Sequence, residues 1–187
     1  EEVNLLAGYI AELLGKFELA QRLFLSSTKP LRALEMQKNL LHWDEALALA
    51  RHLAPQEVAF ISRELAKHEE YAQNYRRALE NYETAIAVEL TDVEKGAMQE
   101  HIQQCKRGIA RTAIRCGDTK RGIALALQLD DVELLRESAL ILESLKHFQE
   151  AAALFEKCGM LDKAAALYLN VKNLSKLNGL LANIEDR

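Results

Sequence analysis

Acidic residues cluster at Asp130-Asp131-Val132-Glu133, in the form that opens an aspartate-rich magnesium and diphosphate site in all-helical enzymes. Such a site needs carboxylates one helical turn apart that face a second acidic cluster across a cavity. The sequence holds no second cluster of that form. We therefore expect Asp130 to cap the helix that follows, with acidic residues of the first turn at the positive end of the helix dipole.

His101 and Cys105 are four residues apart, a spacing that places both on one face of a helix and that metal sites use. A zinc site needs about four ligands, and neither Cys116 nor Cys158 brings a closely paired partner. Cys105 also falls on an apolar stripe, where a thiol behaves as a small hydrophobic side chain. We therefore predict no metal site and no cofactor. The remaining histidines are scattered at helix edges or turns, and we assign no catalytic role to His42, His52, His68 or His147.

Arginines recur every four residues at Arg107, Arg111 and Arg115, nearly opposite the apolar stripe of the same predicted helix. A solvated outer face is the simpler interpretation of this pattern. The alternative is a docking strip for an acidic partner or a lipid headgroup. The docking interpretation predicts a salt-sensitive contact that is lost when all three arginines become glutamate. These three residues are the candidate protein-binding residues of the sequence.

Composition excludes several classes of function. The chain has 187 residues, of which 49% are hydrophobic and 28% charged, with a net charge of −4. An acidic chain is not typical of a nucleic-acid-binding protein, which usually has a basic surface. No apolar run approaches the ~20 residues that span a bilayer, so we expect no membrane insertion. Without a phosphate-binding glycine loop, a nucleophile elbow or a Ser/His/Asp arrangement, we predict no catalytic residue and no small-molecule substrate.

Apolar spacings of three and four run from end to end, so we predict an all-α fold. Gly15, Gly117 and Gly159 are placed where helices would end in a left-handed residue, and Thr91 with Glu94 forms a capping box. Glycines inside the predicted helices indicate close helix crossings; these are Gly8, Gly96, Gly108, Gly122 and Gly179. The twelve predicted helices cover 2–14, 16–26, 30–40, 43–52, 56–71, 74–88, 92–116, 118–128, 131–144, 147–157, 160–170 and 173–183.

A large residue followed three positions later by alanine recurs after several of the predicted breaks, which indicates repeated units. Over 145–183 the units become regular, with a period of 13 residues. Helices this short need neighbours on both sides. We therefore predict a single α-solenoid over 1–187, built from about twelve short antiparallel helices in degenerate, TPR-like repeats, and cut from a larger protein. The pairs are Phe17/Ala20, Trp43/Ala46, Tyr75/Ala78, Phe148/Ala151 and Leu161/Ala164.

The segment from Trp43 to Ala66, WDEALALARHLAPQEVAFISRELA, resembles the helical-repeat region of the large WD-repeat subunits of intraflagellar transport complex A. The resemblance continues through the unit at Tyr75–Tyr82, the turn at Gly117–Gly122 and the segment at Leu142–Ala152. Coatomer subunits share this plan of β-propellers followed by a solenoid. The resemblance implies one or two propellers N-terminal to the chain. It also implies other complex A subunits as partners, a role in retrograde transport and ciliary membrane-protein entry, and a location in the cytoplasm, cilium and basal body.

Three functions compete at this point. The first is a non-catalytic scaffold that binds other protein subunits, either in a transport train or in a coatomer-like vesicle coat. The second is a TPR-like module that grips a peptide with a row of polar side chains, for which Asn74, Arg77, Asn81 and Lys106 are candidates. The third is an all-helical enzyme, which requires convergent titratable groups in a deep cavity. The sequence favours the scaffold.

Overall fold

The computed structural model describes residues 1–88 and 95–185, and within these residues it contains α-helices, one short 3-10 helix and no strand. The predicted all-α class and the twelve predicted helices are confirmed. The 3-10 helix η1 (Pro55–Glu57) leads into α5. The helices are α1 (Glu2–Leu13), α2 (Phe17–Leu25), α3 (Leu31–Asn39), α4 (Trp43–Leu53), α5 (Val58–Tyr71), α6 (Tyr75–Ala87), α7 (Lys95–Arg115), α8 (Thr119–Leu129), α9 (Val132–Ser144), α10 (Phe148–Lys157), α11 (Leu161–Asn170) and α12 (Leu174–Glu185).

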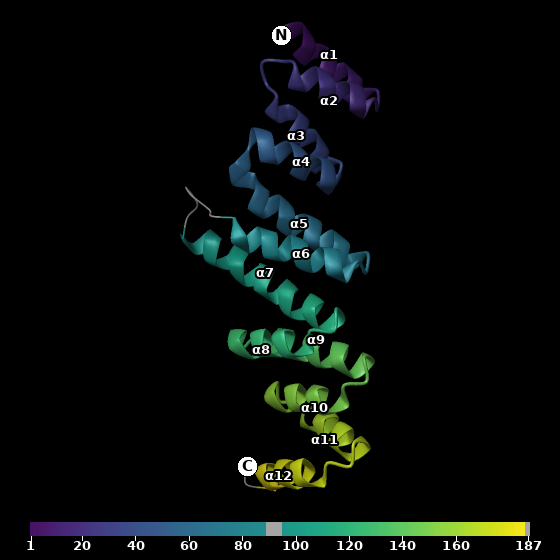
Figure 1. Cartoon of the computed structure of the whole chain (residues 1–187), viewed down its shortest axis with the longest axis vertical. Helices are drawn as coiled ribbons and strands as arrows, with labels where there is room; N and C mark the ends of the chain where they lie inside the picture. The colour runs from purple at the N-terminus through teal and green to yellow at the C-terminus, as the bar shows by residue number, and fades with distance from the viewer. Residues whose placement is uncertain (89–94, 186–187) are drawn as a thin grey trace.

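The helices stack one after another along a single long axis, with the N-terminus at one end and the C-terminus at the other (Figure 1). Each helix packs against its neighbours in the sequence. Helix α7 also contacts α5 and α9, so these three helices lie side by side on one surface of the array. Helices α6 and α8 both pack against α7 but not against each other. The arrangement is the predicted α-solenoid.

The apolar core is not central but runs along the array as four clusters of buried side chains. The five sequence pairs begin α2, α4, α6, α10 and α11. In each pair the alanine is fully buried, which lets the neighbouring helix approach closely, while the large residue is partly buried. Two helical turns after the large residue, four of these helices place an aromatic side chain in the core; these are Phe24, Tyr82, Phe155 and Tyr168.

One turn geometry recurs seven times between consecutive helices. The predicted left-handed residues are confirmed at Gly15, Gly117 and Gly159, with φ of 70°, 93° and 81°. In every one of these turns the next residue donates its N–H to the carbonyl five positions back, as His147 N does to Leu142 O at 2.9 Å. This bond is that of the Schellman motif, and it satisfies a carbonyl oxygen at the end of each helix. Four of the seven turns hold a left-handed residue that is not glycine, and these are Leu41, Gln73, Lys146 and Lys172.

The helices α10, α11 and α12 begin at Phe148, Leu161 and Leu174, which matches the 13-residue spacing of the sequence units. Helix α10 packs against α9 and α11, and α11 packs in turn against α12. Because helices of this length are marginal alone, each depends on the helix before and after it.

The cap of α9 differs from the sequence prediction. Asp131 is the cap, because its Oδ1 accepts the N–H of Leu134 at 3.0 Å. Asp130 instead ends α8 in the left-handed region, with φ of 48°. The predicted cap was therefore wrong by one residue, since only Asp131 has the extended backbone that a cap requires. The predicted capping box of Thr91 and Glu94 lies outside the described residues.

Three of the five helical glycines mark close helix crossings. A Cβ on Gly8 would lie 2.6 Å from the ring of Phe24, and one on Gly108 would collide with the ring of Tyr82. A Cβ on Gly122 would lie 2.6 Å from the carbonyl oxygen of Ala110 in α7. The prediction was wrong for Gly96 and Gly179, where a Cβ would meet nothing within 4 Å.

Candidate functional site

The candidate arginines lie on the surface formed by α5, α7 and α9, and Glu70 of α5 is the carboxylate that joins them. Arg111 of α7 binds it with two parallel bonds, Nε to Oε1 at 2.8 Å and Nη2 to Oε2 at 2.9 Å. Arg115 Nη1 lies 3.4 Å from the same carboxylate. The hydroxyl of Tyr82 donates to Glu70 Oε2 at 2.9 Å. One carboxylate therefore ties α5 to both α6 and α7.

The other side of the arginine row is joined to α9. Arg107 lies 3.1 Å from Asp131 and 3.6 Å from Glu133, and Arg111 lies 3.4 Å from Glu137. Arg115 places its guanidinium over the ring of Tyr75, 4.8 Å from the centroid. The row therefore connects three successive layers of the solenoid.

These contacts revise the picture of a solvated outer face. The side chains of Arg107, Arg111 and Arg115 are only 23% to 34% exposed, and all three have carboxylate partners within the chain. Their charges are largely compensated, so we expect that replacing all three by glutamate would destabilise the fold as well as remove any contact with a partner. Binding of an acidic partner to this row stays a prediction, and single substitutions are the appropriate test.

Burial and these partners shift two pKa values in the cluster. Burial raises the pKa of Tyr82, and the negative charge of Glu70 raises it further, so the phenol stays protonated and donates its hydrogen bond. Burial alone would lower the pKa of Arg111, but hydrogen bonds and the charge of Glu70 outweigh it and raise the pKa. Both shifts favour the forms that make these contacts, the protonated phenol of Tyr82 and the charged guanidinium of Arg111.

Two open depressions flank the pair of Arg111 and Glu70. One, of about 600 Å³, lies between α5 and α7, and its rim carries Tyr71, whose side chain is 91% exposed. The other, of about 570 Å³, lies between α7 and α9 and is lined by Leu140 and Ile141 beside the charged pair. Shallow, mixed polar and apolar surfaces of this kind suit contacts with another protein rather than enclosure of a substrate.

His101 and Cys105 are close together, but both are buried and used internally. His101 Nε2 lies 3.1 Å from the carbonyl oxygen of Ala85, and its Nδ1 lies 3.2 Å from Arg63 Nη1. Since the carbonyl can only accept and the guanidinium can only donate, the ring is neutral with its proton on Nε2. Burial lowers the pKa of His101, and burial raises the pKa of Cys105 to about 11.

The Cys105 Sγ lies 3.7 Å from His101 Nε2. No group of three or more potential metal ligands is found among the described residues. The pair is best described as part of the core that α7 forms with α5 and α6, as the apolar stripe indicated.

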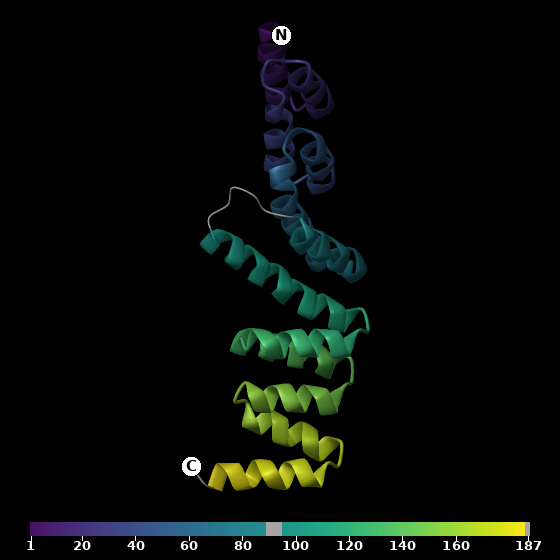
Figure 2. The same cartoon turned by 60° about the vertical axis from the view of Figure 1, so that its left-hand side comes forward.

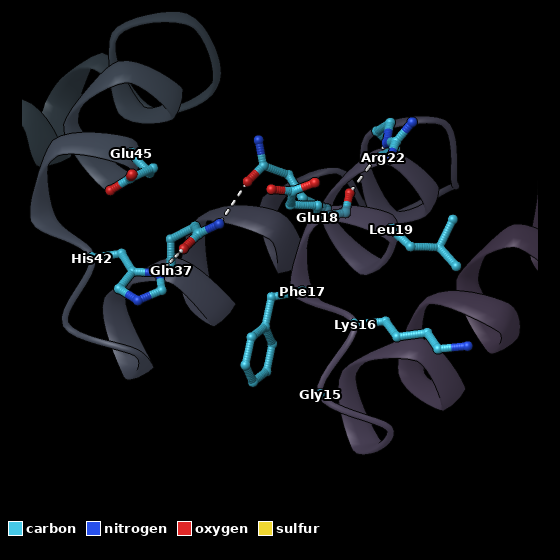
Figure 3. Close-up of a pocket in the computed structure, with 10 residues that line it drawn as sticks. Gly15, Lys16, Phe17, Glu18, Leu19, Arg22, Gln37, His42 and Glu45 are labelled. Atoms are coloured by element: carbon cyan, nitrogen blue, oxygen red, sulfur yellow. Dashed lines mark hydrogen bonds between the residues drawn. The ribbon is translucent and has the colours of Figure 1, made fainter.

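A groove of about 780 Å³, lined by both polar and apolar side chains, lies between the hairpin of α1 and α2 and the hairpin of α3 and α4 (Figure 3). Its floor is a chain of hydrogen bonds, in which Gln37 Nε2 donates to Gln21 Oε1 at 2.6 Å and His42 Nδ1 pairs with Gln37 Oε1 at 2.9 Å. His42 thus has a structural role that the sequence did not reveal, because its partner is set by the turn at Leu41. The groove offers polar contacts but no pairing of a nucleophile with a base.

The row of peptide-binding candidates is not formed. Asn74 donates to Glu69 at 2.7 Å, Arg77 lies 2.8 Å from the same carboxylate, and Asn81 donates to the backbone of Arg77. These contacts hold the turn between α5 and α6 and the first turns of α6. Lys106 lies apart from them, in a groove between α6 and α8.

The chain is similar in sequence to one segment of much longer proteins. It is 44% identical over 141 residues to WD repeat-containing protein 19 of Homo sapiens and 42% identical to that of Mus musculus. It is 38% identical to WD repeat-containing protein dyf-2 of Caenorhabditis elegans. Each match covers 75% of this chain but only about a tenth of the relative. The chain matches no protein-family model, and within the described residues no helix is long and apolar enough to cross a membrane.

Proposed function

We propose, from its relation to WD repeat-containing protein 19, that the chain is a helical-repeat segment that acts as a non-catalytic scaffold for binding other proteins. The observation that carries the proposal is 44% identity over three quarters of the chain. At that level of identity the segment is expected to keep the fold of its relative. The solenoid supports the proposal, because an elongated array exposes a large surface for its length.

The proposal extends to the setting in which the scaffold works. The resemblance to complex A subunits supports a place for the chain in intraflagellar transport complex A, with the other subunits of that complex as its partners. Its location would be the cytoplasm, cilium and basal body, in retrograde transport and the entry of membrane proteins. The two depressions beside Arg111 and the exposed Tyr71 between α5 and α7 support protein contacts of this kind.

Two experiments test the proposal. The tagged chain is purified from ciliated cells and the proteins bound to it are identified by mass spectrometry, and the purified chain is then mixed with individual complex A subunits. We expect at least one subunit to bind directly and to elute with the chain in size-exclusion chromatography. A chain with Tyr71→Ala serves as a surface variant, and Leu127→Ala, at an exposed leucine of α8, serves as its control. If no subunit binds the purified chain, the assignment to complex A is rejected and only the fold remains.

A further inference from the structure

A mostly apolar groove of about 520 Å³ opens between α6 and α8, with α7 as its floor. Ile86 of α6, Ile109 of α7 and Leu125 of α8 line it, together with Ala87 and Ala124. Ile109 belongs to the core cluster of α6 and α7, and Ile86 and Leu125 pack against that cluster. The groove is therefore an exposed continuation of the core, in a part of the array away from the arginine row.

The groove exists because α6 and α8 approach α7 at different places. Tyr82 of α6 packs against Gly108, whereas Gly122 of α8 packs against Ala110 and Ile114. Figure 2 shows α7 crossing obliquely between the two helices, which do not pack against each other. The space left over Ile109 is therefore bounded by three helices and open on the fourth side. A single helix laid along it would complete the packing.

Charges on the rim indicate which helix would fit. Glu83 of α6 and Arg121 of α8 form an ion pair of 2.6 Å, which is the one ion pair that joins these two helices within the described residues. Lys106 also lines the groove and has no ion-pair partner among those residues. The rim therefore carries two positive charges, Lys106 and Arg121, and one negative charge, Glu83, so its net charge is positive.

We propose that the groove of α6, α7 and α8 is a docking site for an amphipathic helix of a partner protein, with aliphatic residues on one face and acidic residues beside them. The aliphatic side chains contact Ile86, Ile109 and Leu125, and the acidic residues face Lys106 and Arg121. The Glu83–Arg121 pair is about half exposed and so is weak enough to open when a helix brings its own carboxylate. The site does not depend on which complex the chain joins.

A fluorescein-labelled peptide of about 18 residues, long enough to form a helix, tests the site by fluorescence anisotropy with the 187-residue chain. A panel carries leucine, isoleucine, phenylalanine or methionine at i, i+3, i+4 and i+7, with glutamate on the flanks. Matched peptides carry lysine in place of the glutamates. We expect the chain to bind at least one acidic peptide with saturation, and to bind its lysine counterpart less tightly.

Three variants locate the bound peptide. Ala124→Arg fills the groove at an exposed position and is expected to weaken binding about tenfold or more. Lys106→Glu is expected to weaken binding of the acidic peptide about fivefold, and Glu83→Gln, which releases Arg121, to strengthen it. Ala153→Arg and Lys157→Glu make the same changes at exposed positions of α10 and should leave binding unchanged. Circular dichroism establishes that each variant folds.

Several outcomes would overturn the site. They are an absence of saturable binding across the panel, equal affinity for acidic and basic peptides, and binding that survives Ala124→Arg. A second copy of the chain could occupy the groove instead, and sedimentation of the free chain tests this. If the chain dimerises and Ala124→Arg makes it monomeric, the groove is an interface between two copies. None of these results bears on binding of complex A subunits, which is measured separately.

Discussion

Replacing Glu70 by glutamine isolates the contribution of the ion pairs that join α5 to α7. Glutamine keeps the shape and can still accept the hydroxyl of Tyr82, but Arg111 and Arg115 lose their shared negative charge. Exposed pairs contribute about 0.2–1 kcal/mol, whereas removing one partner of a buried pair costs about 3–5 kcal/mol. Glu70 and Arg111 are 14% and 23% exposed, so we expect a loss between these limits, about 2 kcal/mol.

The chain supplies a matched control for this substitution in Glu156 of α10. Glu156 Oε2 accepts the hydroxyl of Tyr168 at 2.9 Å, as Glu70 does from Tyr82, and both pairs are 12 residues apart. No arginine or lysine bridges to Glu156 among the described residues. We therefore expect Glu156→Gln to cost no more than about 0.5 kcal/mol, because only the hydrogen bond to the charged acceptor weakens.

Thermal and urea denaturation followed by circular dichroism at 222 nm measures both variants. A loss of about 2 kcal/mol corresponds to a fall in Tm of roughly 4–8 °C for a chain of this size. A double-mutant cycle of Glu70→Gln with Arg111→Gln should give a coupling of about 1–2 kcal/mol. Equal losses for Glu70→Gln and Glu156→Gln, or a coupling near zero, would show that the pairing of Glu70 with the arginines contributes no stability.

Three further predictions use the same denaturation assay. Gly108→Ala should cost about 1–3 kcal/mol, because the buried ring of Tyr82 blocks the added methyl group, whereas Gly96→Ala on the same helix should stabilise by up to about 1 kcal/mol. Lys146→Gly should stabilise the chain and Gly117→Ala destabilise it, each by about 1 kcal/mol. Both residues have a left-handed backbone, which glycine adopts more readily than any other residue. Burial lowers the pKa of His101, so the unfolded chain binds a proton more readily. Stability should therefore fall as pH drops below about 6.5, and His101→Gln should reduce that fall.

The regular features of the fold can be predicted from the sequence because they depend on residues that are close together in the chain. The period of apolar residues predicts each helix, and the pairs of a large residue and an alanine predict which helix faces are buried. Glycine predicts three of the seven recurrent turns. The other four were missed because Leu41, Gln73, Lys146 and Lys172 carry no local preference for a left-handed backbone. The repeat register could have identified them, since each stands two residues before the first residue of a helix.

The candidate site is less predictable, because the spacing of Arg107, Arg111 and Arg115 shows a shared helix face but not what covers it. Their partner Glu70 lies 41 residues before Arg111, and Glu137 lies 26 residues after it. One pattern in the sequence could have identified Glu70. A glutamate 12 residues before a buried tyrosine occurs at Glu70 with Tyr82 and again at Glu156 with Tyr168, and both pairs form the same hydrogen bond.

The sequence alone determined the helices, the three turns that hold a glycine and the repeated burial of small and aromatic residues, because these depend on contacts within one or two helical turns. Tertiary structure decided which carboxylates neutralise the arginines and where α6 and α8 leave a groove over Ile109. Both depend on how helices pack against each other. Close contacts such as Gly108 with Tyr82 and Gly122 with Ala110 join different helices, so their partners cannot be paired from local spacing.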